Sequence, residues 1–524
     1  MSSEPVATIS ECLTTTQDWE VKTTVCITGG CGFLAQHLIK QLNLYTTNIE
    51  CVRVLDFCQF EQALEYTEMI ETHSIIGSVT VMEDLLTATQ EATTVFHLTS
   101  VQDRTMFPDY VIDKDINIEG TRNVIKACQE NSVRNLIYVS NTSVVKSYNS
   151  IISGTEENTS YPKKHLFPDG ESRAEAESLV LGANGLVLKD LTSTLRTLCI
   201  RPVTLYGELD SYLLPHLVDL AIFNEGHIPC IGSLRSKHHF MYVGNAAWAL
   251  LCANKAINKG SFQLPTLIPR ISQSMTEDVW TSGGQTPSTS SGGKRLSKTL
   301  VKPKGKLWGK KLFSSIGRDS RSNSVSLPTV PRTSDPSVSG YSVDVITPPW
   351  ETYDVKGEGK VYFICDDTPP INFFLFIKPI LYRYGYFLTS WSLPEKWAKR
   401  IATVVYVVAL ILYPFIMCNP RVTINDVHHV CRTYTFSDKL ARQRLGYMPI
   451  FNPKEGMRRT TEFYDNKYKE AMMSHLVDHA LSSKHVGMLR RMSMIKRDIA
   501  VMDMTDTGRR FRVKRVDSRN KGWW

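Results

Sequence analysis

The most specific chemical signal in the 524-residue sequence is a glycine-rich turn near its beginning. Residues 24–35 read TVCITGGCGFLA, in which a strand-like apolar run leads through Gly29 and Gly32 into a helical stretch. Glycines here let a pyrophosphate approach the backbone, and the amides that open the following helix attract its negative charge. An ordinary tight turn could contain the same glycines, so the surrounding strand and helix must distinguish a dinucleotide site from such a turn. The residues predicted to hold a dinucleotide are Thr28, Gly29, Gly30, Gly32, Phe33 and Leu34.

An acidic residue follows at the spacing that such a site uses. Asp56 ends the next strand-like run, 24 residues after Gly32. Its carboxylate can accept hydrogen bonds from the adenosine ribose and would repel a 2′-phosphate, which favours NAD over NADP. Arg53 lies on the opposite face of that strand and is not expected to clamp phosphate.

The elements that must position these residues alternate as in an α/β fold. From residue 21 to about 264, apolar runs of strand length alternate with amphipathic helical stretches. This pattern predicts a Rossmann-type, doubly wound parallel sheet with helices on both faces. The expected strands are Thr24–Thr28, Cys51–Phe57, Thr94–Leu98, Leu136–Ser140, Leu195–Arg201 and residues 360–365.

Composition and charge exclude several classes of protein. A hydrophobic content of 42% with ordinary glycine and proline excludes a disulfide scaffold, a collagen-like fibre and a fully disordered chain. A mean hydropathy of −0.17 argues against a polytopic membrane protein. The twelve cysteines are scattered singly without a C-x-x-C pair, so reduced thiols are expected and no metal site is predicted.

The net charge of +8 is a sum of unlike parts. Residues 270–350 carry 12 basic and 5 acidic side chains, and residues 484–524 carry 12 basic and 4 acidic ones, so the rest of the chain has a net negative charge.

The sequence therefore divides into five predicted parts. These are a disordered lead without a secretory signal (1–20), a dinucleotide-binding domain with part of a substrate lobe (21–269), a disordered basic Ser/Pro-rich insertion (270–357), a smaller C-terminal substrate lobe (358–480) and a basic tail (481–524).

Membrane lipid is an expected partner. Residues 401–418 form an uncharged run of 18 residues, at the lower limit for a membrane span, and a monotopic insertion or a buried helix remain as alternatives. Basic residues beside aromatic ones in the insertion and the tail suit an anionic lipid surface. No nucleic-acid recognition fold accompanies them, so no nucleic acid is expected. Ser297 and Ser493 resemble basophilic kinase sites. The alternative for the insertion and the tail is that they are solvated segments without a specific partner.

The sequence resembles the 3β-hydroxysteroid dehydrogenase/Δ5-Δ4 isomerase family of extended short-chain dehydrogenases. The stretches that resemble the family, in its order, are TGGCGFLA (28–35), VRVLDF (52–57), VFHLTS (95–100), NIEGTRNVIKAC (117–128), LIYVSNTS (136–143), AEAESLVLGANG (174–185), LCIRPVTLYGE (198–208), FMYVGNAAWALL (240–251), VYFICDDTPPINFF (361–374) and YTFSDKLARQRLGYMPIF (434–451). The resemblance implies NAD(P)-dependent oxidation of a 3β-hydroxyl on a steroid or sterol-like molecule, in steroid metabolism. By the same resemblance Arg201 and Pro202 border the nicotinamide, although a purely structural turn explains this pair equally well. It also implies attachment to the endoplasmic reticulum, or less readily the mitochondrion, with the main domain facing the cytosol.

The family's general base is the position where this sequence departs from the resemblance. A Tyr-x-x-x-Lys pair is expected there, but Asp169 and Arg173 occupy the two positions, within PDGESRAEAE. A carboxylate is a weak base for an alcohol and Arg173 cannot deprotonate, so the acid–base contribution of about 10²–10⁴-fold is expected to be lost. A simple structural role for Asp169 is as the cap that opens the helix.

The hydroxyls that help this base are also altered. Ser140 is followed by Asn141 instead of a second hydroxyl, with Thr142 and Ser143 beyond it. Tyr161 is the nearest tyrosine that could substitute, but it has no lysine one turn later. Two hypotheses remain: an NAD-dependent hydroxysteroid dehydrogenase, or a degenerate relative that binds NAD(H) and a sterol without hydride transfer. The oligomeric state, including a homo-oligomer, stays open.

Overall fold

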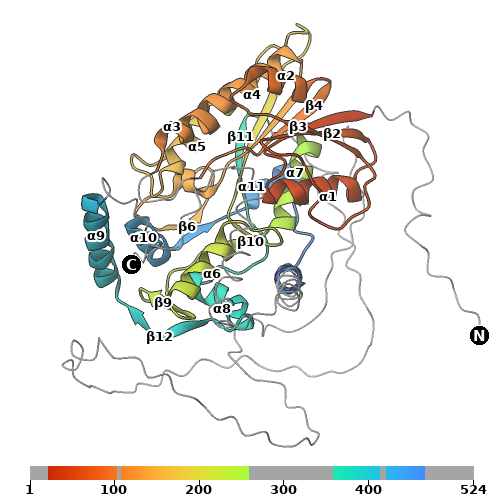
Figure 1. Ribbon diagram of the computed structural model, residues 1–524. Helices are drawn as coiled ribbons and strands as arrows, with labels where there is room; N and C mark the ends of the chain where they lie inside the picture. The colour runs from red at the N-terminus through yellow and green to blue at the C-terminus, as the bar shows by residue number, and fades with distance from the viewer. Residues whose placement is uncertain (1–21, 103–107, 259–357, 413–419, 467–524) are drawn as a thin grey trace, which may run out of the picture. The chain divides into compact units, whose positions relative to one another are not determined.

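A seven-stranded parallel sheet forms the centre of the computed structural model, which describes residues 22–102, 108–258, 358–412 and 420–466 (Figure 1). Its strand order is β11-β7-β5-β4-β1-β2-β3, and every neighbouring pair is parallel. The strands are β1 (Thr23–Thr28), β2 (Ile49–Asp56), β3 (Glu71–Ile76), β4 (Ala92–His97), β5 (Asn135–Val139), β7 (Arg196–Pro202) and β11 (Lys360–Ile364). The predicted doubly wound sheet is therefore confirmed.

Helices cover both faces of this sheet. They are α1 (Phe33–Tyr45), α2 (Met82–Thr89), α3 (Tyr110–Lys114), α4 (Gly120–Glu130), α5 (Asp169–Gly182) and α7 (Val243–Ile257), with a π-helical stretch at Asp115–Glu119 and a 3₁₀ turn at Thr142–Val145. Helix α1 packs beside α7, whereas α4 packs beside both α2 and α5. The two groups lie on opposite sides of the strands in Figure 1.

Strand alternation explains how both faces are buried. Cys26, Val95 and Leu136 are partners across neighbouring strands and turn toward α2, α4 and α5, where they join one apolar cluster. The adjacent residues Ile27 and Phe96 are completely buried on the other face. Strands that are buried on both faces read as continuous apolar runs, and this is why their sequence signal was strong.

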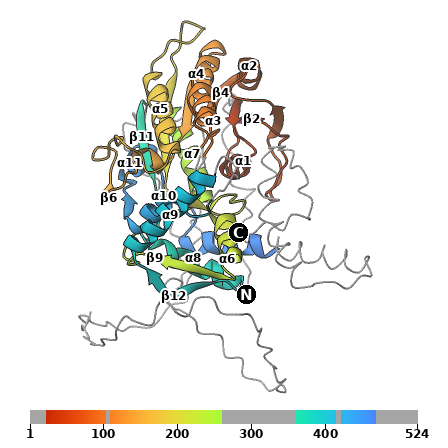
Figure 2. The ribbon, with the colours of Figure 1, turned by 60° about the vertical axis from the view of Figure 1, so that its left-hand side comes forward.

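A smaller lobe is assembled from segments far apart in the chain. Three short parallel pairs, β8 with β10, β9 with β12 and β6 with β13, hold it together. Its elements are β6 (Ile151–Gly154), β8 (Thr204–Tyr206), α6 (Leu213–Phe223), β9 (His227–Ile231), β10 (Phe240–Tyr242), α8 (Phe373–Arg383), β12 (Phe387–Leu393), α9 (Glu395–Leu412), α10 (Ile424–Cys431), β13 (Tyr434–Phe436) and α11 (Lys439–Leu445). Figure 2 shows α6, α8, β9 and β12 together below the sheet.

The predicted strands agree with the observed ones to within two residues at either end, while β3 was not predicted. Its sequence, ETHSII, contains two polar pairs and none of its residues is fully buried, because β3 is the edge of the sheet. The lead (1–20), the insertion (270–357) and the whole tail (481–524), with Ser297 and Ser493, lie outside the described residues.

The predicted apolar segment 401–418 lies partly in α9, which ends at Leu412, and residues 413–419 lie outside the described part of the chain. Among the helices that are described, none has the length and apolar character needed to cross a membrane. The expectation of a spanning helix is therefore not supported there. One face of α9 packs on the lobe through Ala398, Ala402 and Ala409.

Candidate functional site

The glycine turn after β1 has the geometry of a phosphate-binding loop. Gly29 has a φ of +71°, and a Cβ there would lie 2.8 Å from the backbone nitrogen of Thr99. Helix α1 starts at Phe33 with Gly32 as its N-cap, so the cap residue has no side chain that would compete for the first amides. These amides can therefore receive an anion.

Gly30 and Thr28 fix the turn against the neighbouring strands. A Cβ on Gly30 would lie 2.3 Å from Val54 Cγ1, so this glycine allows the turn to lie against β2. The hydroxyl of Thr28 is buried and bonds to His97 Nδ1 at 2.7 Å, while the other ring nitrogen of His97 bonds to the hydroxyl of Thr121 at 2.9 Å. The side chain of Thr28 is thus held inside the sheet.

Asp56 lies at the end of β2 beside the turn. Its Oδ2 accepts a hydrogen bond from the Cys31 amide at 2.9 Å, and its Oδ1 accepts one from the Phe57 amide at 2.7 Å. Burial raises the pKa of this carboxyl, although both amides oppose that effect. Each oxygen keeps a second lone pair for a ribose hydroxyl. Arg53 donates to the carbonyls of Thr87 and Gln90 instead, as its position on the strand predicts.

A cavity of about 460 Å³ extends from this turn into the smaller lobe. Its size is within the usual range for small-molecule sites. Gly29, Gly32, Phe33 and Leu34 line one end of the cavity. The lining residues contributed by the smaller lobe include Leu213, Leu217, Leu220, Ile231, Phe373, Phe374 and Val422. The cavity therefore joins a polar end suited to phosphate with an apolar end.

Ser140 contributes an unpaired hydroxyl to the lining of this cavity. Its Oγ is buried and has no hydrogen-bond partner within the described part of the chain, while its amide donates to the carbonyl of Ile200 at 2.8 Å. Leaving a buried hydroxyl unpaired costs about 1–3 kcal/mol. A ligand hydroxyl or carbonyl in the cavity would remove that cost. Pro202, at the end of β7, also lines the cavity.

Asp169 does not cap helix α5, which corrects the simple structural expectation for this residue. The cap position belongs to Pro168, and no side chain caps the helix there. The Asp169 carboxylate is fully buried, accepts a hydrogen bond from Ser143 Oγ at 3.0 Å and lies 3.4 Å from Arg173 Nε. Arg173 lines the cavity but Asp169 does not. The aspartate is thus directed inward, toward the end of β5.

Asn141 and Ser143 form a small polar cluster with this aspartate. Asn141 Oδ1 accepts from both the amide and the hydroxyl of Ser143 and so caps the 3₁₀ turn. Because a serine hydroxyl carries one hydrogen, it can serve Asn141 or Asp169 at any moment, but not both. The second hydroxyl that the sequence lacks at position 141 is therefore supplied two residues later, and it is engaged with the aspartate.

Tyr161 and Arg201 are joined to Glu177 away from the cavity. Tyr161 donates to Glu177 Oε2 at 2.7 Å, and Arg201 forms a bidentate pair with the same carboxylate, with Nη2 at 2.6 Å. Burial and the Glu177 charge raise the pKa of Tyr161. Neither residue lines the cavity. The structure therefore corrects the expected contact of the Arg201 side chain with a nicotinamide, because alternation along β7 turns Pro202, and not Arg201, toward the cavity.

Sequence reasoning missed a pair of titratable residues that contact each other in the cavity. Lys146 Nζ and His429 Nε2 lie 3.5 Å apart, and both line it. They are separated by 283 positions in the chain, and neither belongs to a motif. Tyr242 and Asn245 have a structural role, since the Tyr242 amide and Asn245 Nδ2 both donate to Asp366 Oδ2.

Fold and site together define a dinucleotide-binding α/β protein with a second lobe that contributes apolar side chains to the cavity. The model of the 3-beta hydroxysteroid dehydrogenase/isomerase family matches residues 26–265, so this part of the chain is similar to that family.

Two relatives extend the likeness beyond the matched residues. The 3beta-hydroxysteroid-dehydrogenase/decarboxylase isoform 2 of Arabidopsis thaliana is 27% identical over 468 residues, which are 87% of this chain and 64% of the relative. The corresponding isoform 1 is 26% identical over 467 residues, which are 87% of this chain and 81% of the relative. The chain thus spans less than two thirds of the first relative.

A solved structure shows the same fold. The epimerase Mth375 of Methanothermobacter thermautotrophicus superposes with a TM-score of 0.51 at 13% identity, over 86% of this chain and 94% of that one. At this identity the likeness concerns the fold alone.

Proposed function

We propose that the chain is an NAD-dependent oxidoreductase of the 3β-hydroxysteroid dehydrogenase kind, which acts on a CH–OH group of a steroid or sterol-like molecule. The observation that carries the proposal is the continuous cavity from the glycine turn to the apolar lobe, with the unpartnered hydroxyl of Ser140 in its lining. The family match and the names of the two plant relatives support this substrate class.

NAD(H) is the proposed cofactor, with NADP(H) disfavoured. The Asp56 carboxylate beside the turn would meet the adenosine ribose and repel a 2′-phosphate. Arg53 is held by two carbonyls at the end of α2 and is not free to bind that phosphate. The bound cofactor would supply hydride acceptance, and the chain would supply the orientation of both reactants.

Proton transfer must differ from the family pattern. The tyrosine position holds Asp169, whose carboxylate is buried outside the cavity lining, and the lysine position holds Arg173. Lys146 and His429 favour retained activity, because they are titratable side chains that line the same cavity. Imidazole is the group that enzymes use most often as a general acid or base.

A second candidate is a binding protein that holds NAD(H) and a sterol without turnover. The inward direction of Asp169 and its hydrogen bond from Ser143 favour it, since neither Asp169 nor Tyr161 lines the cavity. Such a protein would act through ligand or cofactor occupancy. The two candidates share every binding residue and differ only in proton transfer.

The deciding experiment combines NADH formation with binding. Purified full-length protein is incubated with NAD⁺ and a panel of 3β-hydroxysteroids, some of them carrying a carboxylate, and NADH binding is followed by fluorescence. Turnover that falls on changing His429→Gln supports the oxidoreductase with a replaced base. Binding of NADH without any turnover, together with turnover gained in Asp169→Tyr/Arg173→Lys, supports the binding protein. Failure to bind NADH overturns both.

The membrane of the endoplasmic reticulum, more readily than that of the mitochondrion, is the proposed location, with the sheet domain facing the cytosol. Helix α9 supports lipid contact. Ile401, Val404, Val408 and Ile411 share one side of this helix and are 48–65% exposed. Lys396 and Arg400, in its first turns, can approach anionic headgroups. The helix would lie in the interface, with its alanine face on the protein.

A further inference from the structure

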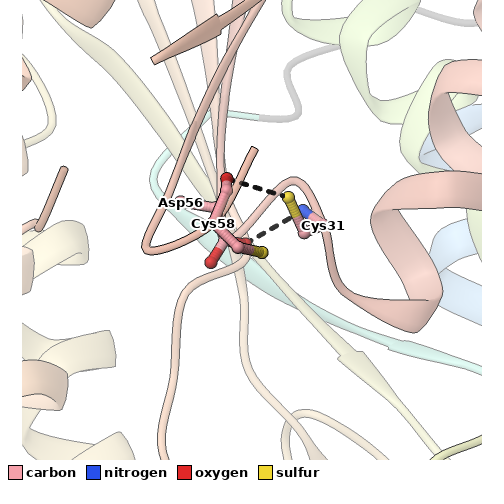
Figure 3. Close-up of side chains that lie close together, drawn as sticks. All are labelled: Cys31, Asp56 and Cys58. Atoms are coloured by element: carbon pink, nitrogen blue, oxygen red, sulfur yellow. Dashed lines mark hydrogen bonds between the residues drawn. The ribbon is translucent and has the colours of Figure 1, made fainter. Parts of the chain in front are cut away.

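Beside the glycine turn, two thiols and one carboxylate gather from separate segments. Cys31 lies in the turn itself, Asp56 ends β2 and Cys58 follows two residues later (Figure 3). The sulfur atoms of both cysteines and a carboxylate oxygen of Asp56 all lie within 4.8 Å of one another. Strands β1 and β2 are parallel neighbours with Thr28 opposite Leu55, so their carboxyl ends bring these three residues together.

We propose that Cys31, Asp56 and Cys58 form a binding site for a thiophilic divalent cation of the zinc type. The site goes beyond the proposed oxidoreductase function and uses none of the residues that line the cavity. Three protein ligands with one open position are a common arrangement for zinc.

The geometry requires only a small adjustment. Metal–sulfur bonds of about 2.3 Å and metal–oxygen bonds of about 2.0–2.2 Å place tetrahedral ligand atoms roughly 3.5–3.8 Å apart. The observed separations of at most 4.8 Å therefore need to shorten by about 1 Å. Rotation of the two cysteine side chains is sufficient for this, because the hydrogen bond from the sulfur of Cys31 to the carbonyl oxygen of Cys58 is weak, at 3.5 Å.

The carboxylate is already oriented as a ligand. The amides of Cys31 and Phe57 donate to its two oxygens and fix its plane. Hydrogen bonds of this kind hold ligating carboxylates in place around protein-bound metals. One lone pair on each oxygen remains for the cation.

Binding of the cation displaces the protons of the two thiols. The cation forms two metal–sulfur bonds and one metal–oxygen bond, and each thiol releases its proton to solvent. A dication with two thiolates and one carboxylate leaves a net charge of −1. No electron is transferred.

Cys31 and Cys58 are more exposed to solvent than most other cysteines in the described residues. Cys31 and Cys58 are half-buried, whereas seven of the eight other cysteines in the described residues are buried. Cys431 is the exception, being half-buried like the pair. It is therefore a matched control at an unrelated position.

The site has a consequence for the cofactor, which rests on the proposed function. Asp56 is the residue expected to accept the adenosine ribose, and Cys31 lies between Gly30 and Gly32 of the turn. A cation held by both residues would occupy the carboxylate and fix the turn. Metal and NAD(H) should therefore exclude one another.

The test uses the full-length protein, reduced and freed of metal, titrated with Co²⁺ and observed through its thiolate charge-transfer and tetrahedral d–d absorption. One equivalent should bind to the wild type and to Cys431→Ser. Cys31→Ser/Cys58→Ser should lose these bands, and Asp56→Asn should weaken binding by about tenfold or more. Bands that persist in the double variant, or that are absent from the wild type, overturn the site.

Competition is measured separately, as NADH fluorescence with increasing Zn²⁺. An apparent NADH affinity that falls in the wild type but not in Cys58→Ser supports mutual exclusion. Metal bands in a protein that binds no NADH would retain the metal site and overturn the cofactor assignment instead. Unchanged NADH affinity at full metal occupancy would overturn the exclusion.

Discussion

The hydroxyl oxygen of Ser143 lies 3.0 Å from Oδ2 of Asp169, and this contact joins the turn after β5 to the first residue of α5. In the family that the sequence resembles, the position of Asp169 belongs to a tyrosine directed at the substrate. Here the side chain turns inward, because a short carboxylate beside Arg173 gains more from an ion pair and a hydroxyl than from an apolar cavity. The contact between Ser143 and Asp169 therefore stabilises the fold at the position where the family has its general base.

Asp169→Ala should strongly destabilise the protein. The change removes the carboxylate beside the buried Arg173 guanidinium, and breaking a buried pair in this way costs about 3–5 kcal/mol. Urea unfolding would measure the loss. Glu462→Ala is the control, because it breaks the exposed pair with Arg458 and should cost about 1 kcal/mol or less. Equal effects of the two variants would contradict a structural role for Asp169.

Tyr161→Phe should leave any NADH formation unchanged. Its hydroxyl is bonded to Glu177 and faces away from the cavity, so it is not available as a substitute base. The variant should lose about 1.5–3 kcal/mol of stability, as expected for a hydrogen bond to a charged acceptor. Steady-state rates and unfolding curves would be measured on the same preparation. A rate that falls in proportion across substrates, at unchanged stability, would assign the tyrosine a role in proton transfer.

Gly29→Ala should weaken NADH binding and lower the melting temperature. The new Cβ would meet the Thr99 backbone at 2.8 Å, and a φ of +71° is unfavourable for alanine. Fluorescence titration and thermal unfolding would report the two effects. Gly182→Ala is the matched control, since it ends α5 with nothing within 4 Å of the added atom and should be neutral or stabilising. Unaltered binding in Gly29→Ala would exclude the turn as the phosphate site.

Stability should fall as the pH is lowered from about 6.5 toward 3, in part because of His97. Burial, with a smaller contribution from Arg173, lowers the pKa of His97 from 6.5 to about 3. Between these values the unfolded chain binds a proton that the folded protein does not, so each pH unit costs about 1.4 kcal/mol per such histidine. Above pH 6.5 the residue is neutral in both states and the effect vanishes.

Urea unfolding at several pH values would measure this slope. His97→Gln should reduce the slope by about one proton, with His73→Gln, at an exposed position, as the control for loss of an imidazole. Burial also lowers the pKa values of His37 and His238 to about 3, so a slope remains in the variant. An unchanged slope in His97→Gln would show that His97 is protonated in the folded state.

Val404→Asp/Ile411→Asp should reduce binding to anionic lipid vesicles by about tenfold or more, because each buried apolar side chain contributes about 1.5–3 kcal/mol. These side chains are 62% and 65% exposed on α9. Vesicle flotation would be compared with Val111→Asp/Ile152→Asp, whose apolar side chains are 67% and 74% exposed on other elements. Equal flotation of both double variants and the wild type would remove α9 from the lipid contact.

Local sequence determined the sheet and the turn. The strands are continuous apolar runs and the glycines stand between strand and helix, so both features depend on residues that are close in the chain. The doubly wound order then follows from alternating strands and helices, because parallel neighbours need helical crossovers.

Only the tertiary structure decided the directions of the side chains around the site. Asp169 meets Ser143 across 26 positions, Lys146 meets His429 across 283, and Cys31 meets Cys58 between two strands. Arg201 and Pro202 are adjacent in sequence, yet only Pro202 reaches the cavity. Such contacts depend on which segments pack together, and a buried charge turns toward whichever partner offsets its desolvation, which no local pattern records.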